Sequence, residues 1–241
     1  KEPLVVAGTD LAARVFRKVD PGLELVVVVE DGARVEPDGR VLEIRGELRS
    51  ILTAERTAMN FLGRLSGIAT LTRRFVEAVA GSGVRILDTR KTTPGLRILE
   101  KEAVVAGGGM NHRMGLYDMV MVKDNHLAAA GGMGTAVERV GKGNVEGLQV
   151  EVEVGSLEEL EEALELGVDR ILLDNMSVES MARAVELARG LGEARPLLEA
   201  SGNMTLDRVG MVAETGVDFI SVGALTHSAP AADLSLRVLP S

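Results

Sequence analysis

The chain has 241 residues, 46% of them hydrophobic, enough to bury one large core or a large domain plus a small one. It contains no cysteine, so disulfides, thiolate metal sites and a cysteine nucleophile are excluded. The net charge of −9 argues against a nucleic-acid surface, because phosphate backbones are bound through excess lysine and arginine. No apolar stretch approaches the roughly 18 residues that span a bilayer, and no signal pattern opens the chain. We therefore expect a cytoplasmic protein without membrane contact.

The first 50 residues contain short β-branched runs at 4–6, 25–29 and 41–44, separated by glycine, proline and aspartate. A helix-like segment covers 11–19. This pattern predicts a small α+β domain. From 53 to 79 the apolar residues keep helical spacing, which predicts a long amphipathic helix or helix pair that joins two domains.

Beyond residue 80, short apolar runs alternate with helical segments. The runs lie at 84–87, 119–122, 148–154, 170–173, 196–198 and 219–222. The clearest helical segments lie at 157–166 and 178–191. Strands that alternate with helices predict a parallel sheet, closed as a barrel or open and doubly wound.

Nearly every run is followed by functional side chains. These clusters are Asp88 to Lys91, Lys123 to His126, Asp174 with Asn175, Glu199 to Asn203, and Gly223 with Thr226 to Ser228. The carboxyl ends of parallel strands converge on one face, where active sites form. Residues 85–126 also carry seven basic against five acidic side chains in an otherwise acidic chain, which favours a small anionic substrate.

Seven short motifs occur in an order and spacing that resemble those of quinolinate phosphoribosyltransferases. They are Glu55 to Asn60, Asp88 to Gly95, Asn111 to Arg113, Lys123 to His126, Glu151 to Val154, Leu173 to Asn175, and Ala200 to Asn203. The resemblance covers essentially the whole chain. It implies transfer of phosphoribosyl from phosphoribosyl pyrophosphate to quinolinate with decarboxylation, giving nicotinate mononucleotide, pyrophosphate and CO₂ in NAD biosynthesis.

The same resemblance implies an incomplete TIM-like α/β barrel, residues 67–225, with a smaller N-terminal α+β sandwich domain, residues 1–66. A C-terminal tail, 226–241, returns to the first domain. Family members usually carry some tens of residues before the point where this chain begins. Because Lys1 also stands in place of a methionine, we expect the sequence to start inside a longer chain or to represent a short member.

A dicarboxylate substrate requires cations, and arginine suits carboxylates because its two parallel donors match two oxygens. By resemblance, the dicarboxylate is held by Arg90, His112, Arg113 and Arg56. Arg56 would reach in from the neighbouring subunit of a homodimer with shared sites, or of a larger oligomer. Without the resemblance, Arg56 on an amphipathic helix would be interpreted as a solvated surface charge. Lys91 and Lys123 would serve the carboxylates or the pyrophosphate.

The predicted catalytic residues are Lys123, Glu153 and Asp174. Carboxylates stabilise an oxocarbenium-like state, and Mg²⁺ on the pyrophosphate stabilises the leaving group, with Glu153 and Asp174 as its ligands directly or through water. Glu151 and Glu153 point to the same side of their strand, so the pattern alone does not choose between them. Family spacing favours Glu153.

The last two strands are followed by segments suited to phosphate, which barrels often bind through backbone N–H groups. The predicted phosphate ligands are Ser201, Gly202, Asn203, Val222, Gly223 and His227. A plain tight turn is the competing interpretation of both segments, and a structural histidine that of His227. The three glycines at 107–109 lack the spacing of a P-loop, and we interpret them as a flexible or close-packed turn.

The residues are also compatible with three other functions. A Schiff-base aldolase would use Lys123 as the nucleophile. A paralogue of the same fold, found with molybdenum transport genes, would have a different substrate. The presence of Arg113 and of the other predicted basic ligands disfavours this paralogue. A non-catalytic phosphoribosyl or nucleotide sensor is disfavoured by the presence of both Glu153 and Asp174.

Overall fold

The computed structural model describes residues 2–239. Predictions that concern Lys1, Pro240 and Ser241 lie outside the described residues. The chain forms two compact units. The first comprises Lys1–Val76, Lys91–Met110 and Ala224–Ser241, and the second comprises Glu77–Arg90 and Asn111–Gly223.

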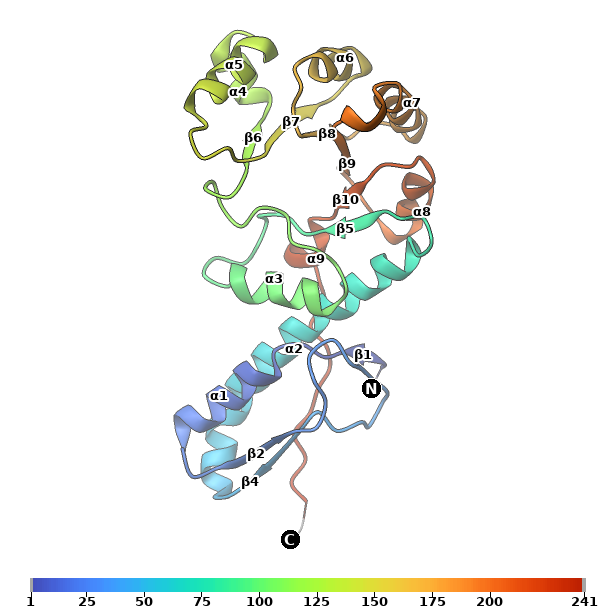
Figure 1. Cartoon of the computed structure of the whole chain (residues 1–241). Coiled ribbons are helices and arrows are strands. Elements are labelled where there is room, and N and C mark those ends of the chain that lie inside the picture. The colour runs from blue at the N-terminus through green and yellow to red at the C-terminus, as the bar shows by residue number, and fades with distance from the viewer. Residues whose placement is uncertain (1, 240–241) are drawn as a thin grey trace. The chain divides into compact units, whose positions relative to one another are not determined.

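The N-terminal part of the first unit consists of short antiparallel strands and two helices (Figure 1). Strand β1 (Leu4–Val5) pairs with β3 (Arg34–Val35), and β2 (Glu24–Val27) pairs with β4 (Leu42–Arg45). Helices α1 (Thr9–Val19) and α2 (Leu48–Ala78) bury apolar faces in one core that includes Phe16, Ile51 and Leu62. The predicted small N-terminal α+β domain is confirmed.

The remaining segments of the first unit are helix α3 (Arg97–Ala106), the short helix α9 (Ala224–His227) and the extended chain end. Ala232, Leu234 and Leu236 of that end pack against the N-terminal core. The close approach requires glycine at Gly67 on α2, where a Cβ atom would lie 1.9 Å from the carbonyl oxygen of Pro230.

The glycines at 107–109 form a close-packed turn. A Cβ atom at Gly107 would lie 2.5 Å from the Thr72 side chain, and one at Gly109 would lie 2.8 Å from the same residue. Side chains are therefore excluded at both positions, which explains why this turn is glycine-rich.

The second unit alternates strands with helices. Its elements are β5 (Arg85–Leu87), β6 (Val120–Val122), α4 (Asp124–Ala130), α5 (Met133–Gly143), β7 (Val150–Val154), α6 (Leu157–Glu165), β8 (Arg170–Asp174), α7 (Val178–Arg189), the 3-10 turn η1 (Gly192–Ala194), β9 (Leu197–Ser201), α8 (Leu206–Glu214) and β10 (Phe219–Ser221). In the described part of the chain its strands form one six-stranded parallel sheet, ordered β5-β10-β9-β8-β7-β6. Helices α5 to α8 lie along the outer face of this curved sheet (Figure 1).

The sheet forms an incomplete barrel, as predicted. Within residues 2–239 its two edge strands, β5 and β6, do not pair with each other. Side chains alternate along each strand, so Glu151 and Glu153 of β7 share the inner face with Arg170 of β8 and Glu199 of β9. Among the described residues, no helix has both the length and the apolar composition that crossing a membrane requires.

Candidate active site

Lys123 and Glu153 form an ion pair at the carboxyl ends of two neighbouring strands. Lys123 directly follows β6, and Glu153 is the penultimate residue of β7, which pairs with β6. The Nζ and Oε2 atoms are 2.5 Å apart, and the two side chains are 41% and 18% exposed. The pair is thus held in place and still accessible to a ligand. An ammonium group in such a pair is a poor nucleophile, because attack on a carbonyl requires a neutral amine, and this disfavours the aldolase.

The loops after β8 and β9 contact each other through side-chain amides. Asp174, the last residue of β8, lies opposite Ser201 at the end of β9. Asn175 Nδ2 donates to Asp174 Oδ2 at 2.9 Å, and Asn203 Nδ2 donates to Asn175 Oδ1 at 3.1 Å. Both asparagines have left-handed backbones, with φ of 53° and 47°. Such backbone conformations cost free energy and cluster at functional sites.

Gly202 allows these two loops to approach each other. Its φ is 94°, and a Cβ atom there would lie 2.1 Å from Asn175 Oδ1, so a side chain is excluded. Within the described part of the chain, the backbone N–H groups of Gly202 and Asn203 donate no hydrogen bond to a protein atom. Two adjacent donors of this kind at a strand end suit a phosphate group.

Arg113 and Arg90 bring two positive charges close together. Arg113 is 9% exposed, and its Nη1 donates to the carbonyl oxygen of Met119 at 3.2 Å. Burial lowers the pKa of Arg113, and the positive charge of Arg90 lowers it further. Neighbouring guanidinium groups repel each other, and an anion that contacts both offsets the repulsion. This arrangement suits a ligand with two carboxylates.

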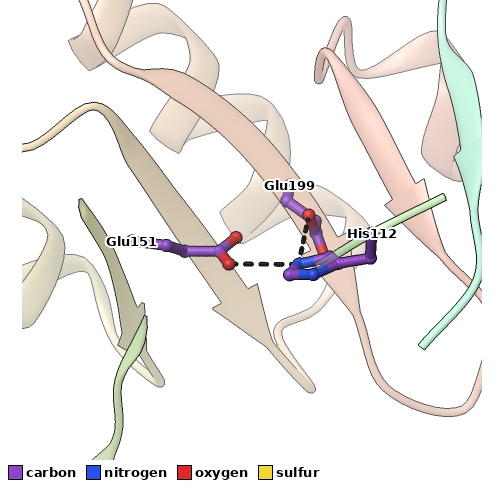
Figure 2. Close-up of side chains that lie close together, drawn as sticks. All are labelled: His112, Glu151 and Glu199. Atoms are coloured by element: carbon purple, nitrogen blue, oxygen red, sulfur yellow. Dashed lines mark ion pairs between the residues drawn. The ribbon is translucent and has the colours of Figure 1, made fainter. Parts of the chain in front are cut away.

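His112 lies inside the second unit between two buried glutamates (Figure 2). Its Nε2 atom is 3.1 Å from Glu151 Oε2 and 3.4 Å from Glu199 Oε2. Arg170 Nη1 donates to the same Glu199 oxygen at 3.1 Å. Ligand atoms of His112, Glu151 and Glu199 lie within 4.8 Å of one another, which by distance alone would fit a metal ion. Because Arg170 already supplies a cationic partner to Glu199 and the His112 ring lies between both carboxylates, we assign the cluster as an ion-pair network.

The other edge of the imidazole is held by the backbone. The Arg113 N–H donates to His112 Nδ1 at 2.7 Å, and the His112 N–H donates to Asp88 Oδ1 at 2.8 Å. In this geometry Nδ1 carries the lone pair and Nε2 carries the proton that faces the glutamates. The backbone at 112–113 is therefore fixed by contacts on both sides.

The two glutamates favour the charged form of His112. Burial opposes that form, but the hydrogen bonds and charges of Glu151 and Glu199 outweigh burial and raise the pKa of His112 to about 9. Burial, and then the charge of Glu199, raise the pKa of Glu151. Burial acts against the charged form of Glu199 as well, but the hydrogen bond and charge of His112, with Ser221 and Arg170, lower the pKa of Glu199. His112 and Glu151 therefore bind protons more tightly than they would in water, and Glu199 less tightly.

We expect the free energy of unfolding to fall between pH 6.5 and pH 9 through His112. The folded pKa of about 9 exceeds the unfolded value of 6.5, so this contribution is complete below pH 6.5 and disappears as pH rises through 9. The loss should be about 1 to 3 kcal/mol, nearer the lower value because the Arg113 amide opposes protonation of Nδ1. Urea unfolding at both pH values measures it. His112→Asn is the control, and an equal pH slope in that variant would contradict the assignment.

The remaining predicted site residues lie in both units. Arg56 is exposed on α2, and His227 ends α9, where its Nδ1 atom is 2.6 Å from Ser228 Oγ. The carbonyl oxygen of Lys91 accepts a hydrogen bond from Thr226 Oγ1 at 2.8 Å. All three residues belong to the first unit. In the second unit, Val222 donates its N–H to the carbonyl oxygen of Leu87 at 2.9 Å, so that amide is not available to a phosphate, and Gly223 follows it.

Three residues of this region were given no role from the sequence: Arg170, Asn175 and Glu199, although Asn175 and Glu199 belong to the polar clusters at the ends of β8 and β9. Strand alternation is the signal that would have found Glu199, because it lies two positions before Ser201 and on the same face of β9. Asn175 was noted only as part of the Leu173 to Asn175 motif, and the sequence does not display the left-handed backbone that directs its side chain.

Two family models together match almost the whole chain. The model described as quinolinate phosphoribosyl transferase, N-terminal domain, matches residues 1–66, and the corresponding C-terminal domain matches residues 68–237. A relative from Synechocystis, named probable nicotinate-nucleotide pyrophosphorylase [carboxylating], is 48% identical over 99% of this chain and 81% of its own length. The chloroplastic Arabidopsis thaliana protein of that name is 46% identical over 99% of this chain and 72% of its own length. The crystal structure of NadC from Streptococcus pyogenes superposes with a TM-score of 0.93 and 42% identity, covering 99% of this chain and 83% of that one.

Proposed function

The chain belongs to the quinolinate phosphoribosyltransferase family, and we propose that it transfers phosphoribosyl from phosphoribosyl pyrophosphate to quinolinate with loss of CO₂. The product is nicotinate mononucleotide, and the reaction serves NAD biosynthesis. The observation that carries the proposal is the match of the two quinolinate phosphoribosyltransferase family models to residues 1–66 and 68–237. Arg90 and Arg113 agree with it, because two cations suit the two adjacent carboxylates of quinolinate.

The reaction breaks two bonds. The pyridine nitrogen attacks C1′ of phosphoribosyl pyrophosphate, and pyrophosphate leaves with the electron pair of its C1′–O bond. The bond from C2 to its carboxylate then breaks, and CO₂ leaves while its electron pair stays on C2, next to the positively charged ring nitrogen. A proton adds to C2. The substrate therefore provides its own electron sink, and no organic cofactor is required.

The side chains at the carboxyl ends of the strands of the second unit, called the mouth below, have separable tasks in this scheme. Arg90, Arg113 and the Lys123 ammonium compensate the carboxylates and hold the pyridine against the sugar. Glu153 and Asp174 face positive charge as it develops on the ribose ring, and carboxylates there lower the barrier. The amides of Gly202 and Asn203 suit a phosphate of the second substrate. Lys91 and His227 stay predicted ligands.

Mg²⁺ fits the residues of the mouth. Glu153 and Asp174 offer hard carboxylate oxygens at adjacent strand ends, which is a donor set that Mg²⁺ accepts when water and phosphate complete its six ligands. When bound, the ion would neutralise negative charge on the departing pyrophosphate. Glu153 and Asp174 would meanwhile orient its water ligands.

We expect turnover to depend on added Mg²⁺ or Mn²⁺ although the free protein binds these ions weakly. Two carboxylates, one of them already paired with Lys123, do not make a tight site without substrate phosphates. Activity at increasing chelator concentration and calorimetric titration of Mg²⁺ into the free protein measure the two parts. Full activity in excess chelator would contradict the requirement, and Ca²⁺ provides a control for nonspecific ionic effects.

A homodimer with shared active sites is the assembly that we propose, and one face of α2 supports it. Leu48 and Leu52 lie two turns and one turn before Arg56 on this helix and are 48% and 50% exposed. Exposed leucines in line with an arginine suit an interface with a second subunit. Arg56 would then reach the partner's dicarboxylate site. Location in the cytoplasm stays a prediction.

The direct test is to incubate the protein with quinolinate, phosphoribosyl pyrophosphate and Mg²⁺ and to measure nicotinate mononucleotide and released CO₂. Both products should appear in equal amounts. Pyrophosphate release without CO₂ would contradict the proposed reaction, because the phosphoribosyl group would then have passed to water or to a quinolinate that keeps its C2 carboxylate. No release would favour a non-catalytic sensor.

A further inference from the structure

The His112, Glu151 and Glu199 cluster lies deeper in the second unit than the residues of the mouth. Glu151 precedes Glu153 by two positions on β7, and Glu199 precedes Ser201 by two positions on β9, so each lies one inward-facing layer below a mouth residue. Both glutamates are fully buried. Two buried carboxylates are costly unless they are paired, so their presence in this layer needs a reason beyond stability.

The pairing of the two glutamates converges on one imidazole (Figure 2). Glu199 has a second cationic partner in Arg170, whose guanidinium also lies 4.3 Å from the centre of the Phe219 ring. Glu151 has no ion-pair partner other than His112 among residues 2–239. The Nε2 atom lies within ion-pair distance of both carboxylates, so the charges of Glu151 and Glu199 together hold this edge of the imidazole.

The opposite edge of the same imidazole holds the backbone of Arg113. The Arg113 N–H reaches His112 Nδ1 at 2.7 Å, and the guanidinium of Arg113 is directed by its bond to the Met119 carbonyl. The contacts therefore run without a gap from the glutamates through the imidazole to the Arg113 backbone. A shift of the imidazole would move the start of the Arg113 side chain.

We propose that Glu151 and Glu199 are positioning residues for quinolinate, which act through His112 to hold Arg113 in the orientation that binds the dicarboxylate. This rests on the proposed function. Neither glutamate touches the substrate in this arrangement. Their effect should be specific to the pyridine substrate, because the only site residue joined to His112 in the chain of contacts described above is Arg113.

The test is steady-state kinetics of Glu151→Gln and Glu199→Gln with each substrate varied in turn. KM for quinolinate should rise about tenfold or more in both variants, because small displacements of a binding group have effects of this size. KM for phosphoribosyl pyrophosphate and the Mg²⁺ requirement should change less than about twofold. Glu151→Gln should disturb folding less than Glu199→Gln, because Arg170 keeps its partner Glu199. If Glu199→Gln does not fold, KM for quinolinate in Glu151→Gln alone tests the proposal.

His112→Asn distinguishes positioning from general destabilisation, because an asparagine oxygen can accept the Arg113 N–H but does not reach the glutamates. Adding Glu151→Gln to His112→Asn should leave KM for quinolinate unchanged, whereas independent effects would multiply. Asp218→Asn is the matched control. It breaks a partly buried ion pair, Asp218 with Arg195 at 2.7 Å, in the same unit, and should lower the melting temperature without changing either KM.

Two outcomes overturn the proposal: an unchanged KM for quinolinate in folded Glu151→Gln, or multiplying effects in the double variant. One stoichiometric divalent ion retained by the purified protein and lost in Glu151→Gln would also overturn it, since the cluster would then be a metal site. Failure of the proposed function is separate, because the unsubstituted protein would then form no nicotinate mononucleotide.

Discussion

At saturating phosphoribosyl pyrophosphate, kcat/KM for quinolinate should exceed kcat/KM for nicotinate by about a thousandfold or more. Nicotinate lacks the C2 carboxylate, so one cation of the Arg90 and Arg113 pair would face no carboxylate when nicotinate binds. A lost charged hydrogen bond to the buried Arg113 side chain costs several kcal/mol, and a loss of about 4 kcal/mol corresponds to this ratio.

Substitutions at the mouth should separate the preference for quinolinate over nicotinate from the reaction rate. Arg113→Ala should reduce both, because it removes the group that nicotinate leaves without a carboxylate, and His112→Ala should do the same by releasing the Arg113 backbone. Asp174→Asn is the control, since it should lower the rate with little change in preference. If the unsubstituted protein used nicotinate nearly as well as quinolinate, the basic cluster would not be a dicarboxylate site.

The parallel sheet was predictable because its strands are largely buried on both faces and are short segments rich in apolar residues that alternate with helical segments. Residues 170–173 and 219–222 are examples, and the structure has strands there at Arg170–Asp174 and Phe219–Ser221. Strand β9 was predicted too early, at 196–198. It extends from Leu197 to Ser201 because the polar residues Glu199 and Ser201 lie inside the unit, where sequence patterns suggest a loop.

Several helices were not predicted because their sequences contain features of turns. Helix α5, Met133–Gly143, contains three glycines after the first residue, and α4 ends at a glycine pair. Burial of Met133 and Ala136 stabilises α5 in spite of the glycines, so tertiary packing overrides local propensity there. Strand β3 has two residues, which is too short to leave an alternation signal.

The position of the site along the strands was predictable, but its depth was not. Clusters after several strands indicated one common face, and the structure brings Lys123 and Glu153 together there. Glu151 and Glu153 are equivalent by alternation, and only the strand register shows that Glu151 lies opposite Arg170 in the interior layer. Glu199 was named in the cluster after the run at 196–198 but was given no role, because it looked like the first residue of a polar loop and lies instead inside β9.

The second large effect that we expect concerns the dimer. Arg56→Ala and Lys123→Ala should each lose about a hundredfold or more of the activity, because each removes a cation that the proposal places beside substrate. A mixture of the two inactive proteins, allowed to exchange subunits, should regain about a quarter of the parent activity. Half of the dimers would be hybrids, and in each hybrid one of two sites would combine an intact Lys123 with the partner's intact Arg56.

This recovery distinguishes a shared site from a site within one chain, because a hybrid of two defective single-chain sites would contain no intact site. Subunit exchange must be shown independently, with two affinity tags and mass measurement of the hybrid, before the absence of recovery has meaning. The matched control is Lys123→Ala mixed with Glu153→Ala. These residues form one ion pair on neighbouring strands of the same chain, so their hybrids should stay inactive. If exchange is complete and the Arg56 mixture stays as inactive as this control, Arg56 does not act across an interface, and the exposed leucines of α2 then need another partner.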